Sequence, residues 1–397
     1  MTSGYPDNTG LSTIRALATG LVKRRSDQSA VEASTNLTRL DLKRFCYVLP
    51  SVRVTALTAL TIAVLAACGG GGSSDSNSTS NQAGSGSTNA SDQTGSPAAS
   101  QKVTLLPPAS APQSVSPTGD PTADSIAFMS AVRRNVGLNQ LTVDQKLVTS
   151  SLNHANYLVL NQATGHNETQ GLPGYTGQSP FTRSDAVFGE VTIAGDIRAF
   201  STSLTGVTSL FDAPFHRFLM LEGYASLGVG ASTSATWEAV NIDFGGFASA
   251  VGDTQLVAYP YSGQTGVPAR WFAAENPNPF ASQPQYQNTY VGYPVTIQAK
   301  LTGRLSSVSI KITDSGGNDV PCFQPSPDGN TEITNGAMCI PYTALKGSTA
   351  YSVHVTGVLK ALHGDTHPID VTWSFTTEAD ASAKFMGNEK QFHVVPE

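Results

Sequence analysis

An uncharged run over residues 54–67 ends at Cys68, and this junction confines the folded part of the chain to the residues that follow it. The run is 14 residues long. It is too short to cross a bilayer as a helix but has the length of a signal-peptide core. Lys43, Arg44 and Arg53 precede the run, and a tract rich in Gly, Ser and Asn follows it. A short buried core segment is the alternative, but such a segment has no reason to lead into a glycine-rich polar tail. We therefore exclude residues 1–67 from the fold.

The stretch Leu65-Ala66-Ala67-Cys68 resembles the end of a bacterial lipoprotein signal, in which small residues precede a cysteine that is acylated and becomes the new N-terminus. On this interpretation the chain is anchored to a membrane of the cell envelope through Cys68, facing the periplasm or the surface. The part before the core is long for a signal peptide, which is consistent with a translation start inside it at a non-Met codon. Residues 68–121 are so polar and glycine-rich that they predict a disordered tether.

Charge and cysteine content narrow the possible partners. Without residues 1–67 the chain carries 15 basic and 25 acidic residues. An acidic chain offers no electrostatic footprint for nucleic acid or for anionic lipid headgroups, so no nucleic-acid partner is expected and the anchor must supply the membrane contact. Cys322 and Cys339 remain as an even pair, which predicts a disulfide in an oxidising compartment. Half of a metal site is the alternative, but two further ligands are missing nearby.

The first globular unit, residues 122–248, places helical patterns before strand patterns, which indicates an α+β unit. Thr142 and Gln145 have the spacing of a capping box, and Gly165 is the expected C-cap of the helix that the box starts. The other expected elements are a helix from about Asp124 that ends by Gly137, helical segments near 186–188 and 203–210, and strands over 226–232 and 237–244.

Residues 249–290 are rich in Pro, Gly and Gln and predict a linker. Over 291–378 the apolar residues alternate with polar ones, which predicts a small antiparallel β-sandwich of immunoglobulin-like character. Residues 379–397 form a tail. The alternating sets are Val295, Ile297, Ala299 and Leu301; Val308, Ile310 and Ile312; Tyr351, Val353 and Val355; and Ile369, Val371, Trp373 and Phe375.

Five stretches occur in an order that resembles the CAP superfamily, also called the SCP or pathogenesis-related-1 domain, over about residues 126–247. They are RRNVGLNQLTVDQKL…HANYL, GHNETQGLPGYTG, FGEV, APFHRFLML and LGVG…VNIDFG. The resemblance implies an α-β-α sandwich with an open cleft, lined in many members by two His and two Glu that can hold a divalent metal. His166, Glu190 and His216 match cleft positions of the family.

The fourth cleft residue does not match. Where animal and plant members place a second histidine, residues 225–228 hold none, so Glu222 or Asp212 would have to complete a metal site, and His154 is a further, weaker candidate. Imidazole and carboxylate ligands suit Zn or a similar divalent ion, and three ligands plus water would permit hydrolysis. The alternative is structural, in which His166 simply hydrogen-bonds Glu190.

Nucleophilic catalysis has little support, because the chain has no GxSxG motif and no Gly-rich phosphate loop after a strand. Two functions remain in view, together with a purely structural role through self-association. The first is a non-enzymatic envelope lipoprotein that binds a lipid or cell-wall ligand in its cleft. The second is a metal-dependent hydrolase that acts on peptide or envelope polymer.

Overall fold

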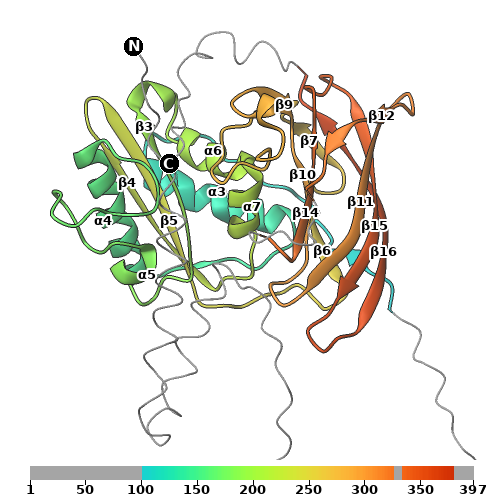
Figure 1. The fold of residues 1–397 in the computed structure, drawn as a ribbon, viewed down its shortest axis with the longest axis horizontal. Coiled ribbons are helices and arrows are strands. Elements are labelled where there is room, and N and C mark those ends of the chain that lie inside the picture. Colours follow the sequence, from blue (N-terminus) through green and yellow to red (C-terminus); the bar gives the residue numbers. More distant parts are fainter. Residues whose placement is uncertain (1–100, 326–332, 380–397) are drawn as a thin grey trace, which may run out of the picture.

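A computed structural model describes residues 101–325 and 333–379 (Figure 1). The predicted signal peptide, Cys68, most of the predicted tether and the tail from residue 380 lie outside the described residues.

The described chain forms successive layers of helices and sheets (Figure 1). Helix α4 covers one face of a four-stranded sheet of order β2-β4-β5-β3, and α3, α6 and α7 cover the other face. Two five-stranded sheets follow beyond these helices. The elements of the first half are α3 (Pro121–Asn135), β2 (Thr142–Val143), α4 (Gln145–Asn161), α5 (Pro180–Arg183), β3 (Gly189–Asp196), a 3₁₀ turn (Ile197–Ala199), α6 (Thr205–Asp212), α7 (Pro214–Met220), β4 (Ser226–Thr233) and β5 (Trp237–Gly245).

Helix α4 lies unusually close to the sheet because two glycines of β4 face it. A Cβ at Gly228 would lie 2.1 Å from the backbone of Leu147, and one at Gly230 would lie 2.2 Å from the backbone nitrogen of Leu152. The helix ends differ from the prediction. Asp144, not Thr142, is the N-cap, since its side chain accepts from the Lys146 amide, and Gln162 in the left-handed region is the C-cap instead of Gly165.

The predictions for the two short helical segments had different outcomes. The one near 203–210 is confirmed as α6, whereas residues 186–188 are not helical and the short helix lies earlier, at α5. The strands over 226–232 and 237–244 are confirmed as β4 and β5. The prediction missed β3, the edge strand that begins with Gly189 and Glu190.

The second half forms two five-stranded sheets, of order β1-β6-β10-β14-β13 and β12-β11-β15-β16-β7, and a two-stranded sheet of β8 and β9. Its elements are β6 (Gln255–Tyr259), β7 (Gln264–Val267), β8 (Arg270–Phe272), a 3₁₀ turn (Pro284–Tyr286), β9 (Tyr290–Gly292), β10 (Val295–Gln298), β11 (Arg304–Asp314), β12 (Asp319–Val320), β13 (Cys322–Phe323), β14 (Gly336–Pro341), β15 (Ala350–Lys360) and β16 (Thr366–Thr377), with β1 (Thr104–Leu105) from the other end of the described chain.

Two boundaries of the prediction are therefore wrong. Residues 249–290 are not a linker, because β6 pairs with β10 and β7 pairs with β16. The predicted tether ends before residue 103, since β1 pairs with β6 and Val103 is buried. These strands were missed because they are short and their hydrogen-bonding partners are distant in the sequence.

The outer sheet confirms the predicted alternation. In β11, β15 and β16 buried apolar residues alternate with exposed polar ones, because one face packs inward and the other meets solvent. Strand β10 is buried at every position and ends at Gln298, so Leu301 falls in a turn. The sheets include the parallel pairs β1·β6 and β7·β16, and the immunoglobulin-like comparison stays a prediction.

The predicted disulfide between Cys322 and Cys339 is confirmed, with the two Cα atoms 5.5 Å apart. It links β13 to β14, which also pair through backbone hydrogen bonds. Closing a loop of this length stabilises a fold by about 3 kcal/mol in the chain-entropy model.

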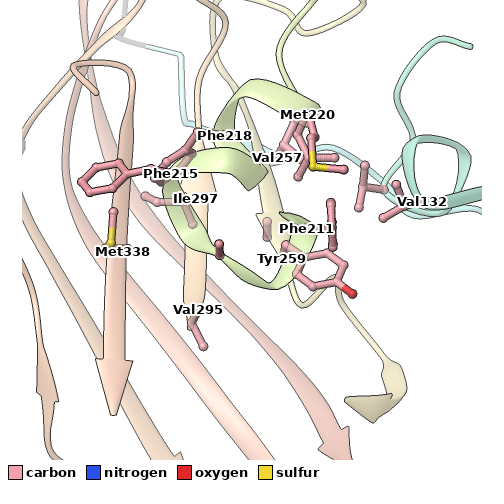
Figure 2. Packing of buried hydrophobic residues seen from close by; sticks show 14 of the residues in the cluster. Val132, Phe211, Phe215, Phe218, Met220, Val257, Tyr259, Val295, Ile297 and Met338 are labelled. Carbon is pink, nitrogen blue, oxygen red and sulfur yellow. The ribbon is translucent and has the colours of Figure 1, made fainter. Parts of the chain in front are cut away.

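The larger of two apolar clusters joins the two halves, and α7 lies at its centre (Figure 2). Figure 2 shows Phe215 and Phe218 of α7 beside Ile297 of β10 and Met338 of β14. Arg217, fully buried, lies with its guanidinium carbon 4.7 Å from the ring centre of Tyr259, and it donates to the Pro294 carbonyl at 2.7 Å. The first unit and the two sheets thus share one interior.

Candidate functional site

A cavity of about 190 Å³ lies where the edge strand β3, the α6–α7 corner and the segment after β7 meet. Both halves of the chain supply its walls. The lining residues are Thr164, Gly165, His166, Thr192, Ile193, Ala194, Ser209, Leu210, Asp212, Ala213, His216, Arg270, Trp271, Phe272, Ala274, Glu275, Asn276 and Tyr290.

His166 enters this cavity from the loop after α4 and is held by Glu190 at the start of β3. Its Nδ1 lies 2.9 Å from Glu190 Oε1. The Glu190 side chain is 2% exposed and that of His166 is 23% exposed. Burial opposes ionisation of Glu190, but the hydrogen bond from His166 and the charges of His154, His166 and Arg183 outweigh it and hold the pKa of Glu190 well below its ordinary range. Glu190 is therefore a carboxylate that accepts the Nδ1 proton of His166.

The loop that carries His166 is itself fixed by a buried glutamate, Glu168. Its carboxylate accepts from the Thr176 amide at 2.6 Å and lies 3.0 Å from His154 Nδ1, while His154 Nε2 lies 3.0 Å from the Gly165 carbonyl. Burial raises the pKa of Glu168, but its hydrogen bonds from His154 and Thr176 lower it more. His154 is fully buried beneath the loop and does not line the cavity, so it positions the loop and is not a cleft ligand.

Arg183 of α5 connects these groups. Its Nη1 donates to the His166 carbonyl at 2.8 Å, its Nη2 is in close contact with Glu190 Oε2, and its Nε lies 3.8 Å from Glu168 Oε1. The Arg183 side chain is 1% exposed. One buried guanidinium thus compensates two buried carboxylates and fixes the backbone of His166.

Behind Glu190, β5 supplies a second carboxyl group, Asp243, directly opposite Glu190 in the antiparallel register. Asn241 Nδ2 donates to both, at 3.2 Å to Glu190 and 3.1 Å to Asp243. Burial, and then repulsion by Glu190, raise the pKa of Asp243 well above its ordinary value. Asp243 is neutral while Glu190 is ionised, because two adjacent buried carboxyl groups do not both carry a charge.

His216 of α7 reaches the same cavity from the other side and is held by a different glutamate. Its Nδ1 and its backbone amide each lie 2.7 Å from Glu275 Oε1. The Glu275 side chain is fully buried, and His216 is 14% exposed. His216 therefore does not join Glu190. The two histidines belong to two separate pairs, and both histidines line one cavity.

The remaining predicted candidates separate into one that lines the cavity and one that does not. Asp212 lines it and accepts from the Tyr293 hydroxyl at 2.6 Å; burial raises the pKa of Asp212 to about 6. Glu222 is buried between the two halves, where it accepts from Gln298 at 3.0 Å and Asn335 at 2.9 Å. Glu222 is a structural group and does not complete a metal site with His166.

The donor set argues against a three-ligand metal site. Among residues 101–325 and 333–379, no three His, Cys, Asp or Glu residues converge as a metal-binding group. His166 and His216 each engage a carboxylate through Nδ1, as zinc-bound histidines often do, so only Nε2 of either ring could contact a metal or a ligand. Two such nitrogens fall short of the three protein ligands of a catalytic zinc site, and within the described part of the chain Asp212 of the same lining does not converge with them into a metal-binding group.

Sequence reasoning missed Arg183, Asp243 and Glu275. A signal existed for Asp243, because Asn241 and Asp243 interrupt the apolar residues of β5 at alternate positions on one face. No local signal existed for Glu275. It lies in a segment that was predicted as a linker, and its partner is 59 residues away.

Comparisons with known proteins give one family match, which covers part of the chain. Residues 126–244 match the model of the CAP family, described as the cysteine-rich secretory protein family. The match supports a CAP domain over these residues, which contain His166, Glu190 and His216 but not Glu275. No curated protein is significantly similar to the chain.

Three solved structures are similar to part of the chain, and each match covers 31% of it. An extracellular protein with an SCP domain from Bacillus anthracis is 16% identical with a TM-score of 0.26, and the match spans 40% of that protein. An outer surface protein from Borrelia burgdorferi is 16% identical with a TM-score of 0.26 over 89% of its length. CopC from Methylosinus trichosporium OB3b is 18% identical with a TM-score of 0.20 over 92% of its length.

Proposed function

We propose that this chain is a cell-envelope lipoprotein whose CAP domain and C-terminal sheets together form a non-enzymatic binding site for a small ligand, or for the end of a larger lipid or cell-wall ligand. One observation carries the proposal: a single cavity is lined by two carboxylate-held histidines and by apolar side chains from both halves. Concave sites with an apolar wall and a few fixed polar groups are the usual form of small-molecule sites.

The apolar wall would hold the body of the ligand. Trp271 and Phe272 come from β8, and Leu210 comes from α6 on the opposite side. The polar end would contact Nε2 of His166 or His216, since each Nδ1 faces its glutamate. The buried glutamates hold the ring orientations in advance, which reduces the ordering cost of binding.

The binding proposal is tested with a panel of ring-sized probes (phenol, benzamide and benzoate), titrated into the full chain while tryptophan emission is recorded. We expect at least one probe to change the emission, and the change to disappear in Trp271→Phe, which removes the cavity tryptophan. Trp373→Phe is the control, because Trp373 is buried in β16 and its indole donates to the Pro260 carbonyl. A panel without any Trp271-dependent response would contradict the proposed site.

A metal-dependent hydrolase is the second candidate, and the carboxylate–histidine pairs are the observation that favours it. Elemental analysis of the purified chain, with His166→Ala beside it, separates the two. Under the binding proposal we expect substoichiometric metal in both. One equivalent of Zn that His166→Ala abolishes would favour the hydrolase instead.

Membrane attachment is proposed to be through lipid on Cys68. No helix within residues 101–325 and 333–379 is long and apolar enough to cross a membrane. Cys68→Ser removes the thiol that acylation requires, so we expect it to abolish palmitate labelling and to move the chain from the membrane fraction to the soluble fraction. A Ser variant that is still labelled and still sediments with membranes would show that the anchor lies elsewhere.

A further inference from the structure

We infer that the ligand of this cavity is an extended segment of another polypeptide chain, which pairs as an additional strand along the free edge of β3 through the backbone of Thr192 and Ala194. The inference rests on the proposed function and names its ligand class. Three observations support it: the place of the cavity in the sheet, the backbone groups that face it, and its size.

The cavity runs along the edge of β3 that faces away from β5. Within the described part of the chain β3 pairs only with β5, so it ends the four-stranded sheet. Three consecutive residues of β3, Thr192, Ile193 and Ala194, line the cavity, whereas none of the described residues of β5 does. Consecutive residues of a strand alternate between its two faces. A cavity that touches all three therefore lies beside the strand and not over one of its faces.

The walls on both sides of this edge agree with that position. Ala194 packs with Tyr157 of α4 on one face of the sheet. Ile193 packs against the larger apolar cluster on the other face. The lining includes His166 from the loop after α4 and Leu210 from α6, which cover opposite faces. The cavity thus passes around the edge of the sheet, where an added strand would lie.

Thr192 and Ala194 direct their backbone N–H and C=O groups toward this edge. The amide of Ile197 donates to the Thr236 carbonyl at 3.0 Å, which continues the ladder between β3 and β5 by one pair. In an antiparallel ladder, pairs that exchange hydrogen bonds alternate with pairs whose backbone groups point away from each other. Counted back from Ile197, Ile193 is bonded to β5, and Thr192 and Ala194 face the free edge.

These outward backbone groups are buried and unpaired. Thr192 and Ala194 are each 9% exposed, and no hydrogen bond joins their backbone to a described residue outside β5. Buried N–H and C=O groups in proteins are nearly always paired, because an unpaired one costs free energy. A ligand that brings one donor and one acceptor to each of the two residues would remove this cost.

A peptide backbone has the matching pattern. An extended chain presents an N–H and a C=O on the same edge at every second residue, which is how a peptide adds to an exposed sheet edge. An acyl chain has no such groups, and sugar hydroxyls lack the repeat. Glu275 of the same lining offers a further acceptor, because its Oε2 is buried with no hydrogen-bond partner among the described residues. An added strand has N–H donors on its second edge as well.

The size of the cavity limits the paired segment to a few residues. Thr192 and Ala194 are two positions apart, which is about 6.6 Å in an extended chain. The cavity holds about 190 Å³. An apolar cavity of about 150 Å³ holds benzene in another protein, so this one takes about two residues with small side chains. A second copy of this chain does not supply the strand from its own β3, because that edge lies in the same recess.

The first test titrates the full chain with three blocked, uncharged tripeptides by calorimetry. The parent is acetyl-Ala-Val-Ala-amide, the second peptide is methylated on the valine nitrogen, and the third is methylated on both alanine nitrogens. We expect the parent to bind with a dissociation constant of about 1 mM or tighter. Only one set of alternate N–H groups faces β3. One methylated form should therefore bind within about 3-fold of the parent, and the other at least about 10-fold more weakly.

Thr192→Pro connects the binding to the free edge of β3. Proline removes the outward N–H of residue 192 and leaves the bonds to β5, since edge strands tolerate proline where the N–H points outward. We expect it to weaken the parent tripeptide by at least about 10-fold. Thr192→Val is the matched control, because it keeps the N–H and the branched shape, and it should bind within about 3-fold of the natural chain. Circular dichroism checks that both variants fold, and the methylated peptides decide the question on the natural chain if Thr192→Pro does not.

Each contrary outcome is distinct. Equal affinities of the two methylated peptides, or full binding by a folded Thr192→Pro chain, would overturn the backbone pairing but leave the proposed binding site in place. If no tripeptide binds while a ring-sized probe still gives the Trp271-dependent emission change, the ligand of the cavity is not a peptide. No response to any tripeptide or ring-sized probe would overturn the proposed function as well.

Discussion

The two histidine–glutamate pairs of the cavity have similar geometry but different support. His166 and Glu190 both come from residues 126–244, which match the CAP family model, and a buried network of Arg183, Asn241 and Asp243 stands behind them. His216 also comes from this matched region, but Glu275 comes from the second half, and its Oε2 has no hydrogen-bond partner among the described residues.

This difference separates two ways to fix the orientation of a histidine that lines a cavity. The first pair is fixed by polar and charged neighbours of Glu190, so its geometry depends on Arg183 of α5 and on the side chains of β5. The second is fixed by the packing of the two halves, because Glu275 reaches His216 only when α7 is docked on the sheets through Phe218 and Arg217. The cavity is complete only when both halves fold together.

Among the changes considered, removal of Arg183, which supports only the first pair, should cause the largest loss in the free energy of unfolding. Arg183→Met leaves Glu168 and Glu190 buried without their cation, and loss of one partner from a buried ion pair typically costs about 3–5 kcal/mol. We expect urea unfolding to show a loss of this order, with the His166 side of the cavity disordered.

The control for Arg183→Met is Arg198→Met. Arg198 pairs with Asp196 at the surface, where both side chains are well exposed, so its removal should leave the unfolding midpoint unchanged. Similar midpoints for the two variants would show that the buried network does not support the first pair.

Matched Glu→Gln changes compare the two pairs directly. Glu190→Gln removes the charge to which Arg183 and His166 are bound, and we expect a loss of about 1–3 kcal/mol in the free energy of unfolding. Glu275→Gln keeps an oxygen that can accept from both His216 donors, so we expect a loss below about 1 kcal/mol. Chemical denaturation measures both, and a larger loss for Glu275→Gln would reverse the comparison.

The sequence predicted the first pair far better than the second, for a physical reason. His166 and Glu190 follow a local motif order, and the alternation in β11, β15 and β16 is a period that sheet geometry imposes on the sequence. Glu275 depends on tertiary docking of short strands, and no spacing encodes that. The polar network behind Glu190 was partly predictable. The pattern of β5 indicates polar side chains on one face of the strand, but it does not show which residues they contact.

The contributions of Glu190 and Asp243 to the stability of the fold should change with pH in opposite directions. The pKa of Glu190 is lowered, so its contribution to stability is present above its ordinary value of 4.5 and is lost as the pH falls below it. The pKa of Asp243 is raised, so its contribution is full below its ordinary value of 3.8 and is lost as the pH rises toward the native value. Asp243→Asn should therefore gain stability relative to the natural chain as the pH rises.

Urea unfolding at several pH values from acid to mildly alkaline measures this gain. Asp370→Asn is the control, because Asp370 is exposed and its partner is His354, so any difference it causes should not grow toward alkaline pH. If the Asp243→Asn difference stays constant over the range, Asp243 does not hold a proton in the folded chain.

The smallest expected effect concerns Asp212, which, like His216, depends on a partner from the second half. Burial raises the pKa of Asp212 to about 6, and the hydroxyl of Tyr293 moderates that rise by donating to the ionised form. Tyr293→Phe removes this donor, so the titration midpoint of Asp212, followed by the carbon-13 shift of its carboxyl group, should move upward. Tyr351→Phe removes a hydroxyl that accepts from the Lys346 amide in the outer sheet, and it should leave the midpoint in place. An unchanged midpoint in Tyr293→Phe would mean that docking of the second half does not tune this side of the cavity, and that its influence is confined to His216.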